Sequence, residues 1–213
     1  MTRRGRHTLP RQAASVLFHA FCGLVFLFLL LPLIVVVPIS FSDSAYLQFP
    51  PPRYSLRWYR AIAGNERFAS GFVLSLQVGV TATLLGLAVG VPAAMCVSRY
   101  RFRGREALNS LMLFPLMVPG VVLGMALYVF HVEAEIALEG SVPILGSLGG
   151  LIAGHVLVVI PWTVRLVTAS LAGFDRTIEE AAQSLGADRL TTFRRITVPS
   201  ILPGIVAAAL FGF

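Results

Sequence analysis

Long apolar stretches alternate with short polar ones along this chain. Four of the apolar stretches reach the roughly 20 residues that a helix needs to cross about 30 Å of hydrocarbon, and they cover residues 15–38, 70–98, 107–131 and 149–171. A fifth begins at residue 200 and reaches only to residue 213, which is too short to cross. The pattern therefore predicts an all-α, polytopic membrane helix bundle with four complete spans and a truncated fifth.

Composition and glycine spacing agree with a packed membrane bundle. Of the 213 residues 56% are hydrophobic and 13% are charged, and the mean hydropathy is +0.80, which excludes an ordinary soluble domain. The second, third and fourth stretches each carry two glycines four residues apart, namely Gly86 and Gly90, Gly120 and Gly124, and Gly150 and Gly154. Such pairs let helix backbones approach closely, so we expect packed helix faces there.

The basic residues are all arginines, because no lysine occurs in the sequence. A phosphate-gripping P-loop needs its lysine, so this chain is not itself a Walker-type ATPase. No nucleophile elbow, His-Glu-x-x-His pattern or pair of in-membrane carboxylates is present, and Cys22 and Cys96 lie in separate apolar stretches as packing residues. We expect no catalytic residue, no cofactor and no metal, and we expect that the chain is not an enzyme.

The placement of charge predicts a topology. The first 14 residues and the polar stretch after the second span are arginine-rich, so both are expected in the cytoplasm; they carry Arg3, Arg4, Arg6 and Arg11, then Arg99, Arg101, Arg103 and Arg105. The loop after the third span is acidic and expected outside, with Glu133, Glu135 and Glu139. Residues 39–69 carry arginines against this trend, but alternation places them outside. The first span is long for a signal peptide, which favours an uncleaved anchor.

The most ordered polar segment is residues 175–199, between the fourth and fifth apolar stretches. Thr177 and Glu180 have capping-box spacing, which predicts a helix start. Behind this cap, four residues at helical spacing form one narrow apolar face, while Glu179 points elsewhere; the four are Ile178, Ala181, Ala182 and Leu185. A narrow apolar face of this kind suits a groove on another protein.

A second short helix is expected in the same segment. Gly186 can adopt the left-handed conformation that ends the first helix, and Asp188 can cap the next. The second helix carries Leu190, Phe193 and Ile196, and Pro199 is expected to stop it.

Two interpretations of this helix pair compete. It has the spacing of a DNA-binding helix-turn-helix, with glycine in the turn and arginines on the second helix. However, its four arginines are balanced by four carboxylates, so it has no net positive field, and the flanking spans would press it against the bilayer; the carboxylates are Asp175, Glu179, Glu180 and Asp188. We therefore expect a cytoplasmic plug and no nucleic acid partner.

Ionisable residues within the spans are few. His19, His155 and Arg165 stand alone and His131 lies at a margin, so core or interfacial histidines and an arginine that reaches the cytoplasmic surface are favoured over a proton pathway. An ATP-independent secondary transporter remains the alternative class. It would need an in-membrane ion-coupling site, and no carboxylate lies clearly inside a span.

The segment 175–199 resembles the EAA loop of permeases from binding-protein-dependent ABC importers. That pattern is Glu-Ala-Ala, three residues, Gly, nine residues and Ile-x-Leu-Pro, and this chain has Glu180-Ala181-Ala182, Gly186 and Ile196-Thr197-Val198-Pro199, with Val198 replacing leucine. Further stretches also look like that family, over residues 98–104, 114–120 and 160–165. Members usually have six spans, whereas this chain stops inside the fifth.

The resemblance implies a fold and a set of roles. It implies the type I ABC importer permease fold over residues 15–213, with residues 1–14 as a cytoplasmic segment, in the bacterial plasma (inner) membrane. Residues that couple to the ATPase would be Ile178, Glu180, Ala181, Ala182, Leu185, Gly186, Ile196 and Pro199. Implied partners are an ATP-binding ABC subunit, a second permease subunit, identical or different, an external substrate-binding protein and membrane lipid.

The resemblance also suggests a substrate. Residues 41–44 and 54–59 are similar to the spermidine/putrescine branch of these permeases, so polyamine uptake is the first expectation. Ferric iron, sulfate, phosphonate and other small solutes remain as alternatives, because related permeases share these signatures.

Overall fold

The computed structural model describes residues 11–213, with side chains from residue 13 onward. Residues 1–10 of the predicted cytoplasmic segment 1–14 lie outside the described residues, and residues 11–14 form the start of the first helix. The chain divides into an N-terminal unit that ends at Ser70 and a C-terminal unit, Gly71–Phe213. The described elements are helices, apart from one isolated β-bridge between Ser42 and Tyr54.

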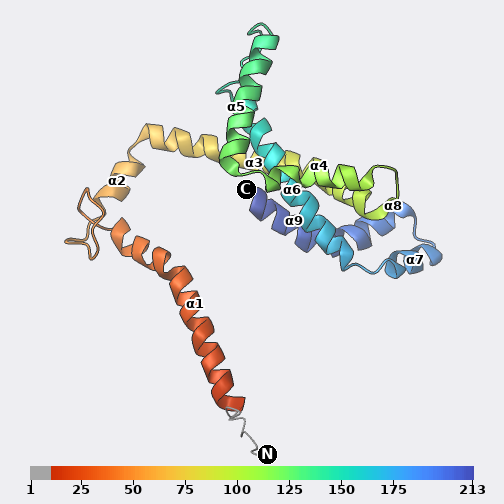
Figure 1. Cartoon of the computed structure of the whole chain (residues 1–213), viewed down its shortest axis with the longest axis horizontal. Coiled ribbons are helices and arrows are strands. Elements are labelled where there is room, and N and C mark those ends of the chain that lie inside the picture. Colours follow the sequence, from red (N-terminus) through yellow and green to blue (C-terminus); the bar gives the residue numbers. More distant parts are fainter. Residues whose placement is uncertain (1–10) are drawn as a thin grey trace, which may run out of the picture. The chain divides into compact units, whose positions relative to one another are not determined.

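The N-terminal unit contains two helices and the start of a third. Helix α1 is Arg11–Ser40, α2 is Arg57–Ala63, and α3, Glu66–Arg99, begins here and continues into the other unit (Figure 1). Arg57 contacts the loop before α2, because its Nη1 lies 3.4 Å from Asp43 Oδ1. Its Cζ lies 4.6 Å from the ring centre of Trp58. The short helix α2 follows Ser55, whose hydroxyl accepts the Arg57 amide at 3.0 Å.

The C-terminal unit holds the rest of α3 and all later elements. These are α4 Arg105–Met117, α5 Gly120–Ala137, α6 Leu148–Ala172, α7 Thr177–Ser184, α8 Arg189–Thr192, the π-helical turn η1 Phe193–Thr197, and α9 Val198–Gly212. Figure 1 shows α6 running beside α9, with α7 and α8 at one end of that pair. One cluster of buried hydrophobic residues lies between α3, α6 and α9 and contains Ala94, Val164, Val167 and Ile201.

Five helical stretches are long and apolar enough to cross a membrane in the described part of the chain. They are Ala13–Ser40, Glu66–Arg99, Gly120–Ala137, Leu148–Ala172 and Arg189–Gly212. The all-α, polytopic character is confirmed. Two of the expected spans, however, are placed differently.

The predicted third span, residues 107–131, is wrong. The helix breaks at Val118, whose φ of −85° and ψ of 131° are extended, and Pro119 follows it. A residue before proline is pushed out of the α region by a clash with the proline ring, so the apolar run splits into α4 and α5. The membrane-length helix is α5, which extends to Ala137.

The expected stop at Pro199 is also wrong. The chain continues from α8 through η1 into α9, and the Val198 amide donates to the Phe193 carbonyl, five residues back. Proline is tolerated in the first turn of a helix, and the wider π turn comes immediately before it. The fifth apolar helix is therefore Arg189–Gly212 and not a short stretch from residue 200.

Of the three glycine pairs, Gly86 and Gly90 are the pair at which both glycines pack closely against another described helix. A Cβ on Gly86 or Gly90 would collide with Val159 or Thr163 of α6, the latter at 2.6 Å, so α3 and α6 approach through these two glycines. A Cβ on Gly120 or Gly124 would meet nothing within 4 Å among the described residues. Gly150 instead packs against the carbonyl of Ile144 in the preceding loop.

Candidate functional site

Asp175 begins the polar segment 175–199 and supplies its first cap. Its Oδ1 accepts the Thr177 amide at 2.9 Å, and this bond, followed by that of the Thr177 hydroxyl, lowers the pKa of Asp175. The predicted capping box is therefore wrong: Thr177 is the first residue of α7, and Glu180 caps no amide in the described structure. The carboxylate two residues before the helix competes successfully for the free amide.

Gly186 ends α7 as predicted. Its φ is +92°, and two backbone bonds close the helix: Gly186 N donates to Gln183 O, and Ala187 N donates to Ala182 O, each at 3.0 Å. This is the Schellman arrangement, which requires a left-handed residue and therefore favours glycine. The turn that follows is fixed in direction by the backbone.

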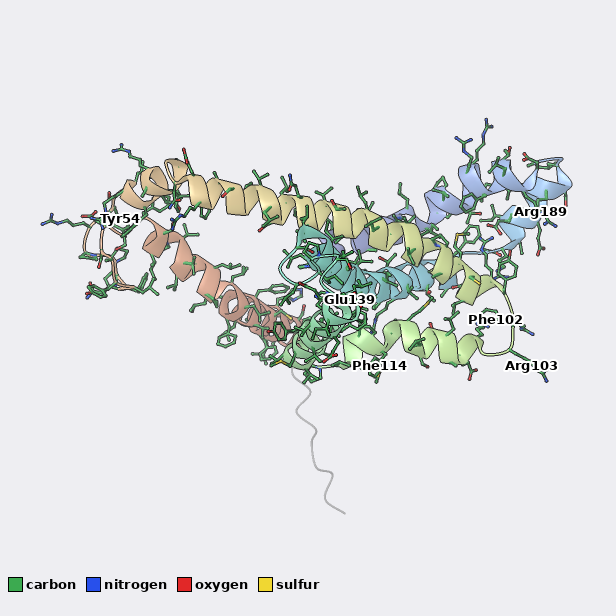
Figure 2. The ribbon with its side chains drawn as sticks, turned by 90° about the horizontal axis from the view of Figure 1, so that it is seen from above. Tyr54, Phe102, Arg103, Phe114, Glu139 and Arg189 are labelled. Atoms are coloured by element: carbon green, nitrogen blue, oxygen red, sulfur yellow. The ribbon has the colours of Figure 1, made fainter. Side chains whose placement is uncertain are left out.

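Asp188 occupies the N-cap position of α8, as expected, but its side chain makes no capping hydrogen bond. Its backbone is extended, with φ −71° and ψ 164°, and its carbonyl accepts both the amide and the hydroxyl of Thr192, each at 3.0 Å. Arg189 lies at the same end of the C-terminal unit as Phe102 and Arg103 of the α3–α4 loop, as Figure 2 shows. The segment 175–199 and the α3–α4 loop thus share one end of the bundle.

Glu179 holds α7 to that end. It is 9% exposed, and its Oε1 lies 2.6 Å from Nη2 of Arg99, the last residue of α3. The hydroxyl of Thr197, which is buried in η1, donates to the same oxygen. One carboxylate therefore joins three elements: the end of α3, the first turn of α7 and the π turn before α9.

The charge state of Glu179 follows from these contacts. Burial raises the pKa of Glu179, but the hydrogen bonds from Arg99 and Thr197, with the positive charges of Arg99 and Arg176, outweigh it, so its pKa lies below the ordinary value. Arg176 adds a second attachment, because its Nη2 donates to the Ser98 carbonyl at 3.0 Å. The start of α7 is thus tied twice to the end of α3.

The predicted apolar face of α7 is open. Ile178 is 51% exposed and Leu185 is 90% exposed, Ala181 is exposed and Ala182 is half-buried. Glu180 and Gly186 are exposed beside them. The structure therefore brings these six predicted residues together on an accessible helix and its end, whereas Ile196 is half-buried and Pro199 is exposed in the next helices.

The residues missed by sequence reasoning are those that anchor the segment. The sequence places Glu179 off the apolar face, and it marks Arg99 only as one of the arginines that indicate topology. Their contact joins positions 80 residues apart, and no periodicity in a single sequence marks such a pair. The one available signal was the position of Glu179 beside the apolar face and not on it.

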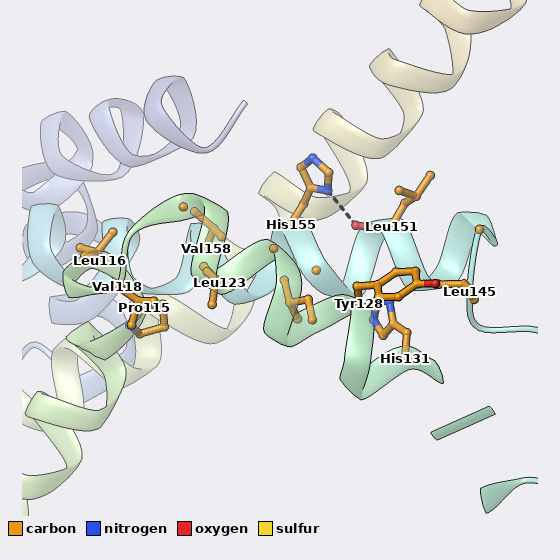
Figure 3. Close-up of a pocket in the computed structure, with 16 residues that line it drawn as sticks. Pro115, Leu116, Val118, Leu123, Tyr128, His131, Leu145, Leu151, His155 and Val158 are labelled. Carbon is orange, nitrogen blue, oxygen red and sulfur yellow. Dashed lines mark hydrogen bonds between the residues drawn. The ribbon is translucent and has the colours of Figure 1, made fainter. Parts of the chain in front are cut away.

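A second candidate site is an apolar groove of about 690 Å³ between α4, α5 and α6 (Figure 3). Pro115, Tyr128, His131 and His155 line it. Nδ1 of His155 lies 2.7 Å from the Leu151 carbonyl of its own helix, and His19 has the same relation to Ser15. His155 and His19 are exposed and are not core residues. Each ring is hydrogen-bonded to the backbone carbonyl four residues earlier in its own helix.

The acidic residues expected in the loop after the third span lie mostly in a helix. Glu133 and Glu135 belong to α5 and not to a loop, because that helix extends to Ala137. The Glu135 carboxylate accepts the amides of Ile144 and Leu145 at 3.1 and 2.9 Å. Glu135 therefore fastens the connection to α6.

Comparison with known proteins identifies the family. Residues 82–213 match the model of the binding-protein-dependent transport system inner membrane component. The chain is 29% identical to the spermidine/putrescine transport system permease protein PotC of Haemophilus influenzae, over 92% of this chain and 72% of that protein. It is 32% identical to the putrescine transport system permease protein PotI of Escherichia coli, over 88% of this chain and 66% of PotI.

Other relatives differ in what their names state. The probable molybdenum ABC transporter permease protein of Haloferax volcanii is 36% identical over 70% of this chain and 55% of its own length, so the chain spans about half of it. In fold, the chain is similar to a bacterial ABC transporter involved in the import of the acidic polysaccharide alginate, with a TM-score of 0.65, 16% identity, and coverage of 98% of this chain and 72% of that one. Because the family model covers more than half of the chain, the protein belongs to the inner membrane components of binding-protein-dependent transport systems.

Proposed function

We propose that this chain is a permease subunit of an ATP-driven importer, and that α7 is the helix through which a separate ATPase subunit moves it. The observation that carries this proposal is the contrast between two sides of α7: Glu179 is buried and ion-paired, whereas Ile178 and Leu185 are exposed. A short helix that is anchored on one side and apolar on another suits a groove in a partner. The chain itself lacks the lysine that a P-loop needs.

The anchor gives a route for motion. A displacement of α7 would pass through Glu179 to Arg99 at the end of α3, and through Thr197 to the π turn before α9. Both α3 and α9 belong to membrane-length helices, and a π turn is a common site of helix bending. Movement of the partner would thereby shift these spans between inward-open and outward-open arrangements.

Further partners follow from the family. The family description refers to a binding protein, which supports an external substrate-binding protein as the source of substrate. A second permease subunit would complete the translocation path, and the open groove between α4, α5 and α6 supplies apolar surface for another membrane helix. We further propose that the N-terminus faces the cytoplasm, in line with the arginine distribution.

The proposed substrate is a polyamine. Support comes from the PotC and PotI relatives, which match 92% and 88% of this chain. A molybdenum-containing oxyanion is the second candidate, because the Haloferax relative has the higher identity of 36%, although over 70% of the chain. These candidates have opposite charge, so one competition experiment separates them.

The test is uptake into proteoliposomes that contain the permease complex with its ATPase subunit and binding protein. We expect labelled putrescine to accumulate only when ATP is present on the side of the membrane that carries the ATPase subunit. Excess unlabelled spermidine should compete with putrescine for uptake, and molybdate should not. Omission of the ATPase subunit is the matched control. Uptake that is unchanged without ATP would favour the secondary-transporter class. ATP-dependent uptake of labelled molybdate, with no uptake of putrescine, would replace the polyamine assignment while leaving ATP coupling intact.

A further inference from the structure

A pocket of about 390 Å³ lies where α3 and α6 end and α7 begins. Its polar lining residues come from three helices and the cap of a fourth: Ser98 and Arg99 of α3, Arg105 of α4, Thr168 of α6, and Arg176 before α7. Leu171 and Phe174 contribute apolar wall. We call this set the basic pocket.

The basic pocket collects polar atoms that have no partner. Four buried side-chain nitrogen or oxygen atoms lack a hydrogen bond within the part of the chain that the structure describes, and three belong to this pocket: Ser98 Oγ, Arg99 Nε and Thr168 Oγ1. Buried polar groups are almost always hydrogen-bonded, and leaving one unsatisfied lowers stability. Three such atoms belong to residues that line one cavity, so this wall holds polar groups that the described chain leaves unsatisfied.

The charge of the basic pocket points to an anion. Arg99 is paired with Glu179 through Nη2, which leaves its Nε unused. Arg105 and Arg176 have no carboxylate within 4.0 Å among residues 13–213, and no acidic residue lines the cavity. Arg176 spends one Nη2 bond on the Ser98 carbonyl and keeps its other donors. The pocket therefore has a net positive field and several unused donors.

We propose that the basic pocket binds a phosphate group. Arginine forks match phosphate oxygens in geometry, and two hydroxyls can complete the shell of a group that accepts bonds from several directions. The group can come from the headgroup of an anionic lipid or from soluble phosphate, since basic pockets between helix ends on the cytoplasmic side take lipid headgroups. The bound group would join Arg176 at the start of α7 to Thr168 and Arg105 of the bundle. This binding does not depend on the transport assignment.

The test measures the thermal unfolding midpoint of the purified full chain in two arms. In the first arm, detergent-solubilised protein is titrated with inorganic phosphate at constant ionic strength. In the second arm, protein in phosphatidylcholine vesicles is compared with protein in vesicles that also contain phosphatidylglycerol. We expect a rise of the midpoint in at least one arm. Phosphate alone indicates a soluble ligand, and phosphatidylglycerol alone indicates a lipid headgroup.

Three variants localise the effect. Arg105→Gln should raise the ligand concentration needed for the same midpoint shift about tenfold, because a charge-assisted hydrogen bond is lost. Thr168→Val should also weaken the response. The midpoint without ligand should stay equal or rise, because valine has the shape of threonine but lacks the unsatisfied hydroxyl. Arg103→Gln is the control, because Arg103 is exposed in the same loop and does not line the pocket. No response in either arm, or an equal loss in the Arg103 and Arg105 variants, would overturn the proposal.

Discussion

Nη2 of Arg99 lies 2.6 Å from Oε1 of Glu179, and this contact fixes the first turn of α7 to the last residue of α3. A second donor, the Thr197 hydroxyl, binds the same oxygen. The strength of the ion pair can be measured with Arg99→Gln, Glu179→Gln and the double variant. We expect each single change to raise the hydrogen exchange of α7 amides, with a coupling energy of about 1–2 kcal/mol between them.

Glu180→Gln is the matched control for this cycle, since its carboxylate is exposed one position away. The α7 amides of the Glu180→Gln variant should exchange hydrogen as fast as those of the unmodified chain. Purely additive effects of the two single changes would mean that the ion pair does not hold α7.

The same carboxylate predicts a pH dependence. The folded pKa of Glu179 is lowered, so its stabilising contribution is present above the ordinary glutamate pKa and is lost as the pH falls through the folded value. We expect the hydrogen exchange of the α7 amides, corrected for the intrinsic effect of pH on exchange, to become faster as the pH falls through the lowered pKa of Glu179. Glu179→Gln should remove this component, and an unchanged slope in that variant would assign it to another group, with Asp175 the next candidate because its pKa is also lowered.

Gly186→Ala tests the end of α7. At a φ of +92° an alanine Cβ is strained, so we expect a local cost of about 1 kcal/mol, seen as faster exchange near residues 182–187, and reduced uptake in the reconstituted complex. Gly124→Ala provides the comparison, because nothing lies within 4 Å of its added Cβ and its φ is not positive. Equal behaviour of the two variants would show that the turn tolerates another geometry.

Gly90→Ala tests the contact between α3 and α6. Its Cβ would lie 2.6 Å from Cβ of Thr163, which is fully buried and cannot move away. We expect a loss of about 1–3 kcal/mol in the free energy of unfolding, measured as a lower thermal midpoint. Thr163→Ala in the same chain should restore part of it, and no restoration would place the strain elsewhere.

Leu185→Asp tests the apolar face of α7. Leu185 is 90% exposed, so the fold should be unaffected, but a charge in an apolar interface should abolish co-purification of the ATPase subunit. Gln183→Asp adds the same charge at another exposed position of the helix and should retain most of the binding. Full ATPase binding by the Leu185 variant would contradict the docking role of this face.

Much of the architecture was predictable because membrane crossing depends on local composition. Apolar length alone located α1, α3 and α6 within a few residues, and Gly186 marked the end of α7, since only a residue that accepts positive φ suits that turn. Pro119 is visible in the sequence, but a proline inside an apolar run also fits a kink in one continuous span, so the sequence did not decide that the helix ends at Val118. The passage through Pro199 was hidden because a π turn precedes it.

The sequence by itself determined the all-α membrane character, the absence of a P-loop lysine and the apolar face on the segment 175–199. These properties depend on residue type and short spacing. Only the tertiary structure decided that Glu179 meets Arg99 and Thr197, and that Ser98, Arg105, Thr168 and Arg176 surround one pocket. Such contacts join helix ends far apart in the chain, and their partners are chosen by how the helices pack.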